Sequence, residues 1–527
     1  MTKTRQWLSA ALIWITLLSV LSPAALAVGA EPRSAEAAET YSGSCGASLT
    51  WTLQDGTLTV RGSGNMPDFH MEAPAPWDEL REDIRSVVIE SGVTGIGNMA
   101  FYACPNLRSV SLPGTLRNIR LYAFADCTGL TGLVVPGSVR DISENAFSGC
   151  TGLASLTLSN GVASIGPGAF EGCTGLTRLS LPNSVTDIGD RAFADCSRLA
   201  DVSVSSGLKN LGALPFTNTP WSRAMGDFAV LENVLMEYQG SGGAVTIPSR
   251  VTVIGDYAFC GAERLTGVTI PNSVVSIGRW AFGSSGLKKL TVPSGVLFIG
   301  SQAFADCREL AEVRLADGVM TIGEEAFWNC VKLSSVAVPG SVTGIGGRAF
   351  QDCVRLETVT LANGVTALGE GAFWGCSALR SVSVPDTLDR FDSYAFFNCG
   401  SLTDIRILNR SAVFGKDVFF ACPDAFVLYG YSGSTAQSYA MENGLSFRKL
   451  SDFAAPVLTG AENVQGGVRI RWDKVDGAAK YRVFYKTASG TWKKAGDTAA
   501  TSFTWSGGSP DTKYSFTVRC VTSDGSS

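Results

Sequence analysis

Fourteen cysteines and a single histidine are the residues of this 527-residue chain with the clearest capacity for redox, metal or nucleophilic chemistry. Zinc sites need clustered thiolate and imidazole ligands, and the sequence contains no Cys-x-x-Cys pair. His70 has no second histidine with which to bind a metal, and no nucleophile is marked as its partner in a catalytic triad. We therefore expect no metal and no cofactor, with His70 on the surface of a loop.

Eleven of the cysteines recur every 23 residues in two runs, the first comprising Cys104, Cys127, Cys150, Cys173 and Cys196, and the second Cys307, Cys330, Cys353, Cys376, Cys399 and Cys422. If these repeats stack about 5 Å apart, neighbouring thiols meet the Cα spacing of a disulfide. Each thiol would then have equivalent neighbours on both sides, and two repeats carry Thr219 and Ser285 instead. Cysteine is also among the most commonly buried residues. The pattern favours a buried ladder of reduced thiols, with some disulfides between repeats as the alternative.

Paired carboxylates can catalyse hydrolysis without histidine, and here they would have to come from outward positions of the repeated strands. The acidic residues at the two central outward positions are Asp201, Glu312 and Asp404, and each is four repeats from the next. At about 4.8 Å per repeat they stand about 19 Å apart, beyond the ~5–9.5 Å that separates glycosidase carboxylates. The sequence therefore predicts no catalytic residue and no enzymatic activity.

The outward positions of the expected concave strand face also carry the candidate partner-binding residues. Lys289 is predicted to lie beside Glu312 of the next strand, close to Arg314, and Arg178 beside Asp201, as cross-strand ion pairs. The rest of this face is mainly Ser, Thr and Gly, which suits a simply solvated surface or a broad, shallow binding surface. A formal net charge of −5 without a basic cluster argues against nucleic-acid binding.

These positions are set by an internal repeat whose marker is the dipeptide Ala-Phe. The interval is 23 residues, except for one of 22 and one of 43. The dipeptide supplies Phe101, Phe124, Phe147, Phe170, Phe193, Phe259, Phe282, Phe304, Phe327, Phe350, Phe373 and Phe396. Phe216 and Phe419 keep the step behind Pro215 and Val418, which gives fourteen repeats. A fixed period of this length indicates a solenoid, since one unit cannot bury its apolar face alone.

Each repeat reads Leu-x-x-Val-x-Leu-Pro, then Val, Ile-Gly, Ala-Phe and Cys. The alternation in Val-x-Leu predicts a short strand, and the proline ends it because proline has no N–H. The Ile-Gly-x-x-Ala-Phe segment turns the chain back, so that equivalent residues form one continuous apolar interior. The predicted fold class is a β-rich leucine-rich-repeat solenoid of about fourteen 23-residue rungs, followed by a β-sandwich, with little helix.

The N-terminus has the features of an export signal. Lys3 and Arg5 precede an apolar stretch, and Ala25-Leu26-Ala27 forms a small-residue cleavage site. Residues 1–27 are therefore predicted to be a signal peptide, and residues 28–40, rich in Ala and Glu, a disordered leader. No later segment is long or apolar enough to cross a membrane.

The repeat region is predicted to span residues 84–450, after an N-terminal β cap over residues 41–83. Its C-terminal cap covers residues 423–450 and contains a short helix. Residues 217–241 interrupt the period and are predicted to form a hairpin that turns at Glu232-Asn233 and projects from the array. This insertion is either a decoration or a local contribution to partner binding.

Residues 454–527 change to longer alternating strands, at Val468–Trp472, Tyr481–Tyr485 and Tyr514–Val518. Such strands, separated by Gly, Ser and Asp turns, predict a β-sandwich. Only about six strands are present, so we expect a truncated domain whose last edge strand lies beyond this sequence. It is predicted to act as a spacer, with direct binding as the alternative.

The recurring Leu-x-x-Val-x-Leu-Pro-x-Ser-Val-x-x-Ile-Gly-x-x-Ala-Phe-x-x-Cys resembles the BspA-type leucine-rich repeats of bacterial surface proteins, over about residues 41–450. The segments Leu-Thr-Trp-Thr-Leu from Leu49 and Tyr-Gly-Tyr-Ser-Gly-Ser-Thr-Ala from Tyr429 resemble that family too. The resemblance implies surface or secreted placement and adhesive binding, but no particular partner. The C-terminal region resembles a fibronectin type III domain, with Trp472 as the core tryptophan and Tyr514 matching the corner tyrosine.

We therefore expect a secreted or cell-surface, adhesin-like binding protein whose partner is an extracellular protein or glycan. We expect no nucleic-acid partner, and no transmembrane segment after signal cleavage. Two alternatives remain open at this point: a non-catalytic targeting region of a larger secreted enzyme, and a structural spacer of a surface layer.

Overall fold

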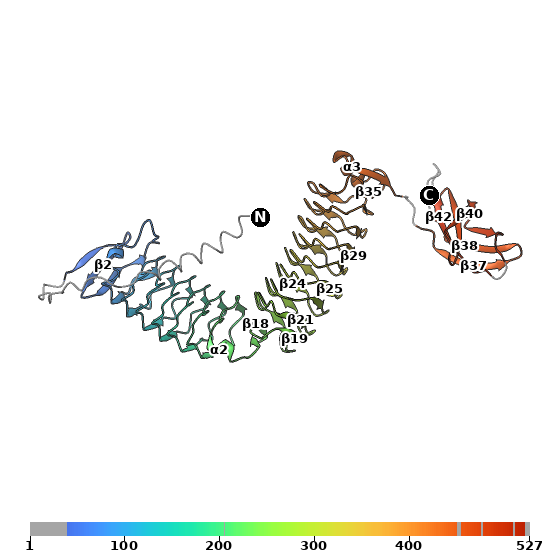
Figure 1. Ribbon diagram of the computed structural model, residues 1–527. Helices are drawn as coiled ribbons and strands as arrows, with labels where there is room; N and C mark the ends of the chain where they lie inside the picture. Colours follow the sequence, from blue (N-terminus) through green and yellow to red (C-terminus); the bar gives the residue numbers. More distant parts are fainter. Residues whose placement is uncertain (1–38, 205, 451–454, 476–477, 510–511, 522–527) are drawn as a thin grey trace, which may run out of the picture.

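The computed structural model describes residues 39–204, 206–450, 455–475, 478–509 and 512–521. The predicted signal peptide over residues 1–27 lies outside the described residues, as does the predicted leader apart from its last two residues. From residue 41 the chain forms a long, curved β-solenoid, and a small sheet domain follows it (Figure 1).

Each repeat contributes two strands, a longer one and a two-residue one, to two parallel ladders. Strands β9 (Gly132–Val135) and β11 (Ser155–Leu158) pair with Ser155 opposite Gly132, which is a step of one repeat. The short strands β8 (Asn118–Ile119) and β10 (Asp141–Ile142) pair at the same step. The second ladder comes from the Ile-Gly segment, for which the sequence indicates only a turn.

The longer strands form five sheets along the array. In spatial order these are β1 (Tyr41–Ser44), β2 (Leu49–Gln54), β3 (Thr57–Gly62), β5 (Ser86–Ile89), β7 (Ser109–Ser111), β9 and β11; then β13 (Arg178–Ser180) and β15 (Asp201–Ser203); β19 (Gly243–Thr246), β21 (Leu265–Thr269), β23 (Lys289–Val292) and β25 (Glu312–Leu315); β27 (Ser335–Val338), β29 (Thr358–Leu361) and β31 (Ser381–Ser383); and β33 (Asp404–Arg406), β35 (Val427–Gly430) and β36 (Ser446–Lys449).

The short strands form two sheets. The first holds β16 (Asn210–Leu211), β14 (Asp187–Ile188), β12 (Ser164–Ile165), β10, β8, β6 (Val93–Ile96) and β4 (Gly64–Asn65). The second holds β17 (Phe228–Leu231), β18 (Val234–Tyr238), β20 (Val253–Ile254), β22 (Ser276–Ile277), β24 (Phe298–Ile299), β26 (Thr321–Ile322), β28 (Gly344–Ile345), β30 (Ala367–Leu368), β32 (Arg390–Phe391) and β34 (Val413–Phe414). Helix in the described residues is limited to the 3-10 turn η1 (Asp78–Leu80), α2 (Pro220–Arg223) and α3 (Thr435–Glu442).

The repeated phenylalanines form stacked columns inside the solenoid. Successive rings lie 4.5 to 5.7 Å apart, and every one of them from Phe101 to Phe419 is buried. Trp77 of the N-terminal cap continues the first column, 5.3 Å from Phe101. Offset contact between aromatic rings adds about 0.5–1.5 kcal/mol per pair to the gain from burial. The constant period of the sequence thus brings equivalent rings of neighbouring repeats into contact.

The thiols of the cysteine ladder lie beside this column. None of the eleven ladder cysteines forms a disulfide. The ten from Cys127 to Cys422 each donate to the carbonyl oxygen of the phenylalanine one repeat earlier, as Cys127 Sγ does to Phe101 O at 3.1 Å. Burial raises the pKa of Cys150 and Cys353 from 9.0 to about 12. These groups are therefore neutral at physiological pH.

The turn between Phe and Cys explains the residue type found there. Asp126, Asp195, Asp306 and Asp352 occupy this position with φ between 58° and 60°. Asp and Asn tolerate this left-handed conformation better than other residues with a Cβ. Their side chains can also bond to the next repeat, as Asn329 Nδ2 does to the Asp306 carboxylate.

The apolar interior is divided in two, which contradicts the single continuous interior predicted from the period. One core cluster runs from Cys45 to Met236 and the other from Leu235 to Ala440. The hairpin β17–β18 separates them. Ala229, Leu231 and Met236 pack into the first core, whereas Leu235 packs into the second.

The same hairpin corrects the prediction that residues 217–241 project from the array. Strand β18 pairs in parallel with β20, so the hairpin is the first member of the ten-stranded sheet. Its two strands turn at Glu232-Asn233, and Glu232 has a φ of 54°. The insertion is therefore an internal wall between two arrays, residues 41–224 and 234–450, which meet at an angle (Figure 1).

The C-terminal region has two three-stranded antiparallel sheets. One contains β37 (Leu458–Val464), β38 (Gly467–Trp472) and β41 (Ser502–Trp505), and the other β40 (Lys493–Thr498), β39 (Lys480–Thr487) and β42 (Tyr514–Val521). Residues of both sheets, including Trp472, Val483 and Val518, share one core. The two sheets thus pack as a β-sandwich, and Cys520 is buried in it.

Candidate binding surface

The structure brings Lys289, Glu312 and Arg314 together on the longer-strand face of the second array. Lys289 on β23 is directly opposite Glu312 on β25, and their side chains are 3.2 Å apart. Arg314, two residues along β25, reaches the same carboxylate at 2.7 Å. Both cationic side chains are about three-quarters exposed, at 77% and 74%. We call these three residues the strand-face cluster.

The electrostatics of the strand-face cluster follow from this shared acceptor. Hydrogen bonding to Lys289, with the nearby positive charges, lowers the pKa of the Glu312 carboxyl. Two cations against one carboxylate leave a single net positive charge. Exposed ion pairs contribute little to stability, because water screens them. The cluster can therefore change partners at small cost, as a binding surface requires.

Arg178 and Asp201 form a separate pair elsewhere on the solenoid. They face one another on β13 and β15, with Arg178 Nε 2.9 Å from the Asp201 carboxylate. Their sheet belongs to the first array, whereas the strand-face cluster belongs to the second. The five candidate residues thus make two patches rather than one.

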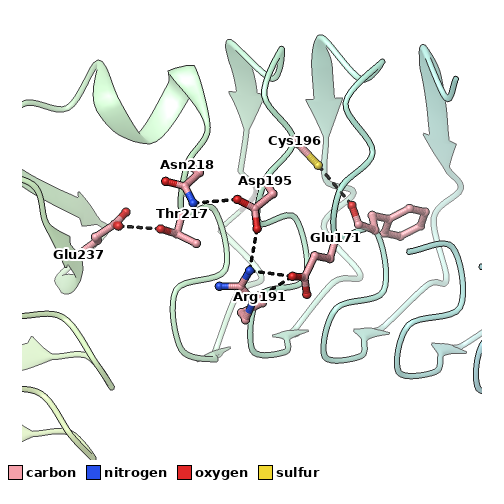
Figure 2. A network of polar contacts seen from close by, with 8 residues as sticks. Glu171, Arg191, Asp195, Cys196, Thr217, Asn218 and Glu237 are labelled. Atoms are coloured by element: carbon pink, nitrogen blue, oxygen red, sulfur yellow. Dashed lines mark hydrogen bonds and ion pairs between the residues drawn. The ribbon is translucent and has the colours of Figure 1, made fainter. Parts of the chain in front are cut away.

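A polar network that the sequence does not single out runs along the Ala-Phe side of the first array (Figure 2). Arg191 donates to Glu171 at 2.7 and 3.1 Å and to Asp195 at 2.7 Å, and Asn218 donates to Asp195 at 2.7 Å. The carboxylates of this network are thus occupied by structural hydrogen bonds. No group of three potential metal ligands occurs among the described residues.

Two hollows in the structure also lie outside the residues that the sequence marks. One, of about 500 Å³, lies where the hairpin meets the first array, beside Arg223, Asp227 and Glu237. The other, of about 360 Å³, lies at the C-terminal cap, beside Phe420 and Asp424. Phe420 follows a ladder phenylalanine, as do Trp374 and Phe397. These aromatic residues, each directly after the phenylalanine of an Ala-Phe or Val-Phe step, were the feature of the sequence that could have pointed to the second hollow.

The repeats match one protein family. Its model, described as a BspA type leucine-rich repeat region, covers residues 81–200, 117–224, 237–354 and 299–426. These overlapping matches span more than half of the 527 residues and leave out only residues 225–236 between them, at the hairpin. The chain belongs to the BspA-type leucine-rich-repeat family.

Several solved structures with leucine-rich repeats are similar to this BspA-type chain. A leucine-rich repeat protein from Eubacterium ventriosum is 24% identical with a TM-score of 0.44, over 73% of this chain and 95% of that one. One from Bacteroides ovatus is 20% identical with a TM-score of 0.35, over 77% and 99%. A leucine-rich cell surface protein from Faecalibacterium prausnitzii is 22% identical with a TM-score of 0.32, over 66% and 96%. The comparison with curated proteins returned no match.

The described part of this BspA-type chain contains no helix with the length and apolar character needed to cross a bilayer. Its longest helix, α3, has eight residues, whereas a membrane-spanning helix needs about 20.

Proposed function

We propose that this chain is a non-catalytic, adhesin-like binding protein, secreted or held at a bacterial cell surface. Its partner is an extracellular protein or glycan, which contacts the longer-strand face around Lys289, Glu312 and Arg314. The observation that carries the proposal is the alternating exposure of these strands. In β23, β27 and β29 the outward residues are exposed while their neighbours are buried in the core.

The composition of this face supports the proposal. Its outward positions in β27 and β29 are Ser335, Ala337, Thr358 and Thr360. A surface of small side chains on a parallel sheet is broad and shallow, which suits a macromolecule better than a small ligand. The family and the signal-like residues 1–27 support an extracellular location.

The experiment is a binding assay of the purified protein on immobilised extracellular-matrix proteins and glycans. We expect the triple variant Lys289→Ala, Glu312→Ala and Arg314→Ala to lose adhesion, whereas Arg178→Ala with Asp201→Ala keeps most of it. Both variants remove exposed ion pairs, so circular dichroism should show both to be folded. Unchanged adhesion of the triple variant would dismiss this face as the contact surface.

For the C-terminal sandwich we propose a fibronectin type III-like spacer over residues 454–527. Tyr514 supports this likeness, because its hydroxyl accepts a hydrogen bond from the backbone N–H of Ser509 at 3.0 Å. A tyrosine bonded to backbone a few residues upstream resembles the tyrosine corner of such domains. A chain ending at residue 450 should then bind as tightly as the full chain in the same assay.

A further inference from the structure

The hollow at the C-terminal cap lies between the last turn of the solenoid and the end of helix α3. Helix α3 is at the far end of the second array (Figure 1). Its volume is about 360 Å³, and its wall includes Asp417, Phe420, Asp424 and Asn443. Tyr439, Gly444, Leu445 and Ser446 also line it. We call this hollow the cap pocket.

The cap pocket is electrostatically one-sided. Asp417 and Asp424 contribute carboxylates, and no lysine, arginine or histidine is among its lining residues. Asp424 is exposed and forms no ion pair within the described part of the chain. Among the residues that the structure describes, the Asp417 carboxylate has one ion-pair contact, a long one of 3.8 Å with the exposed Lys416.

An exposed aromatic ring completes the pocket. Trp374, Phe397 and Phe420 follow the ladder phenylalanines of three successive repeats, with centroids 4.6 and 5.5 Å apart. Phe397 covers one face of Phe420 at an interplanar angle of 19°. Phe420 is the last ring of this row and is 61% exposed. Because Phe397 stacks on one face of Phe420, the ring left uncovered at the end of the row is Phe420, which lines the pocket.

We propose that the cap pocket binds the side chain of an arginine from an extracellular peptide partner. The planar guanidinium lies over the open face of Phe420 and donates to the carboxylates of Asp424 and Asp417. An aromatic face attracts a cation, and a carboxylate accepts two parallel bonds from arginine. Lysine fits less well, because its ammonium is compact, strongly hydrated and cannot stack. This site is remote from the strand-face cluster and independent of it.

The test uses the full chain and two short blocked peptides, acetyl-Gly-Arg-Gly-amide and acetyl-Gly-Gln-Gly-amide. The protein is titrated into each peptide, and the NMR signals of the peptide report its binding. The arginine peptide is expected to bind at least fivefold more tightly than the glutamine peptide, and less tightly as salt is raised. Asp424→Asn and Phe420→Ala should each weaken it by about two- to fivefold. Lys416→Ala should tighten it, because the competing cation is gone.

Both weakening substitutions are at exposed side chains, so neither should impair folding, and circular dichroism checks this. The triple variant of the strand-face cluster should bind the arginine peptide like the unmodified protein, which separates this proposal from the proposed function. Equal binding of the two peptides would overturn the assignment. So would arginine binding that neither Asp424→Asn nor Phe420→Ala reduces.

Discussion

Phe327 lies in the middle of the second aromatic column, 5.2 Å from the rings of Phe304 and Phe350, and is completely buried. Phe327→Ala should cost about 3–5 kcal/mol of unfolding free energy, because it removes a buried ring and leaves a cavity. Thr360 is on the exposed face of β29, so Thr360→Ala should change it by about 0.5 kcal/mol at most. Denaturant unfolding of both variants measures the contrast, and equal costs would contradict the assignment of inside and outside.

The buried thiols should make the protein sensitive to alkali. Burial raises the pKa of Cys353, Cys196 and Cys422 from 9.0 to about 12. Above pH 9 the unfolded chain loses these protons and the folded chain keeps them, so rising pH favours unfolding. Each such thiol can lower the stability by about 1.4 kcal/mol per pH unit between 9 and 12. Stability that depends on these thiols is fully present below pH 9.

Denaturant unfolding between pH 7 and 10.5 should therefore show a steep fall above pH 9. Cys353→Ala should make that fall shallower, because one thiol no longer ionises on unfolding. Cys260, which is the exposed cysteine, provides the matched control, and Cys260→Ala should change the slope less. Parallel slopes for all three proteins would show that the ladder thiols do not control the alkaline transition.

At the scale of single elements, the hairpin β17–β18 links two cores through neighbouring residues. Met236 packs into the first core and Leu235 into the second, and both are buried. Met236→Ala should destabilise the first array and Leu235→Ala the second, each by about 2–5 kcal/mol. Hydrogen exchange read by mass spectrometry can localise the loss, because buried ladder amides exchange only on opening of their own unit. Loss of protection spread equally over both arrays by either variant would mean a single cooperative unit.

The period of the Ala-Phe dipeptide is enough to predict the solenoid, since stacking allows equivalent residues to pack on one another. It cannot reveal the wall, because the wall breaks the period. The apolar runs Phe228–Leu231 and Val234–Met236 were the feature that could have predicted it, because an apolar run without alternation indicates a strand buried on both faces. The cap pocket depends on where α3 folds back, and no local pattern encodes that tertiary contact.

Among the charged residues too, some contacts follow from the repeat and others do not. Lys289 and Glu312 could be paired from the sequence, because a parallel ladder with a constant step puts equivalent positions side by side. Asp190 and Arg279, in contrast, belong to different arrays and approach to 3.6 Å. Their contact depends on the angle at the wall, which the repeat does not specify.

At the scale of the whole molecule, this contact ties the two arrays together across the bend seen in Figure 1. Arg279 reaches both Asp190 of the first array, at 3.6 Å, and Asp256 of its own, at 3.7 Å. Thr217 of the first array adds a hydrogen bond to Glu237 of the wall at 2.6 Å (Figure 2). The Asp190–Arg279 pair is half exposed, so we expect it to stabilise the bend by at most about 1 kcal/mol, less at high salt.

Small-angle X-ray scattering should detect this effect as a change in the spread of particle dimensions. Arg279→Ala should broaden the distribution and raise the radius of gyration, and high salt should do the same to the unmodified protein, because both weaken the charge pair. Lys332→Ala removes an ion pair of 2.7 Å within one array and should leave the curve unchanged. If Arg279→Ala scatters like the unmodified protein, packing of the wall alone sets the angle between the two arrays.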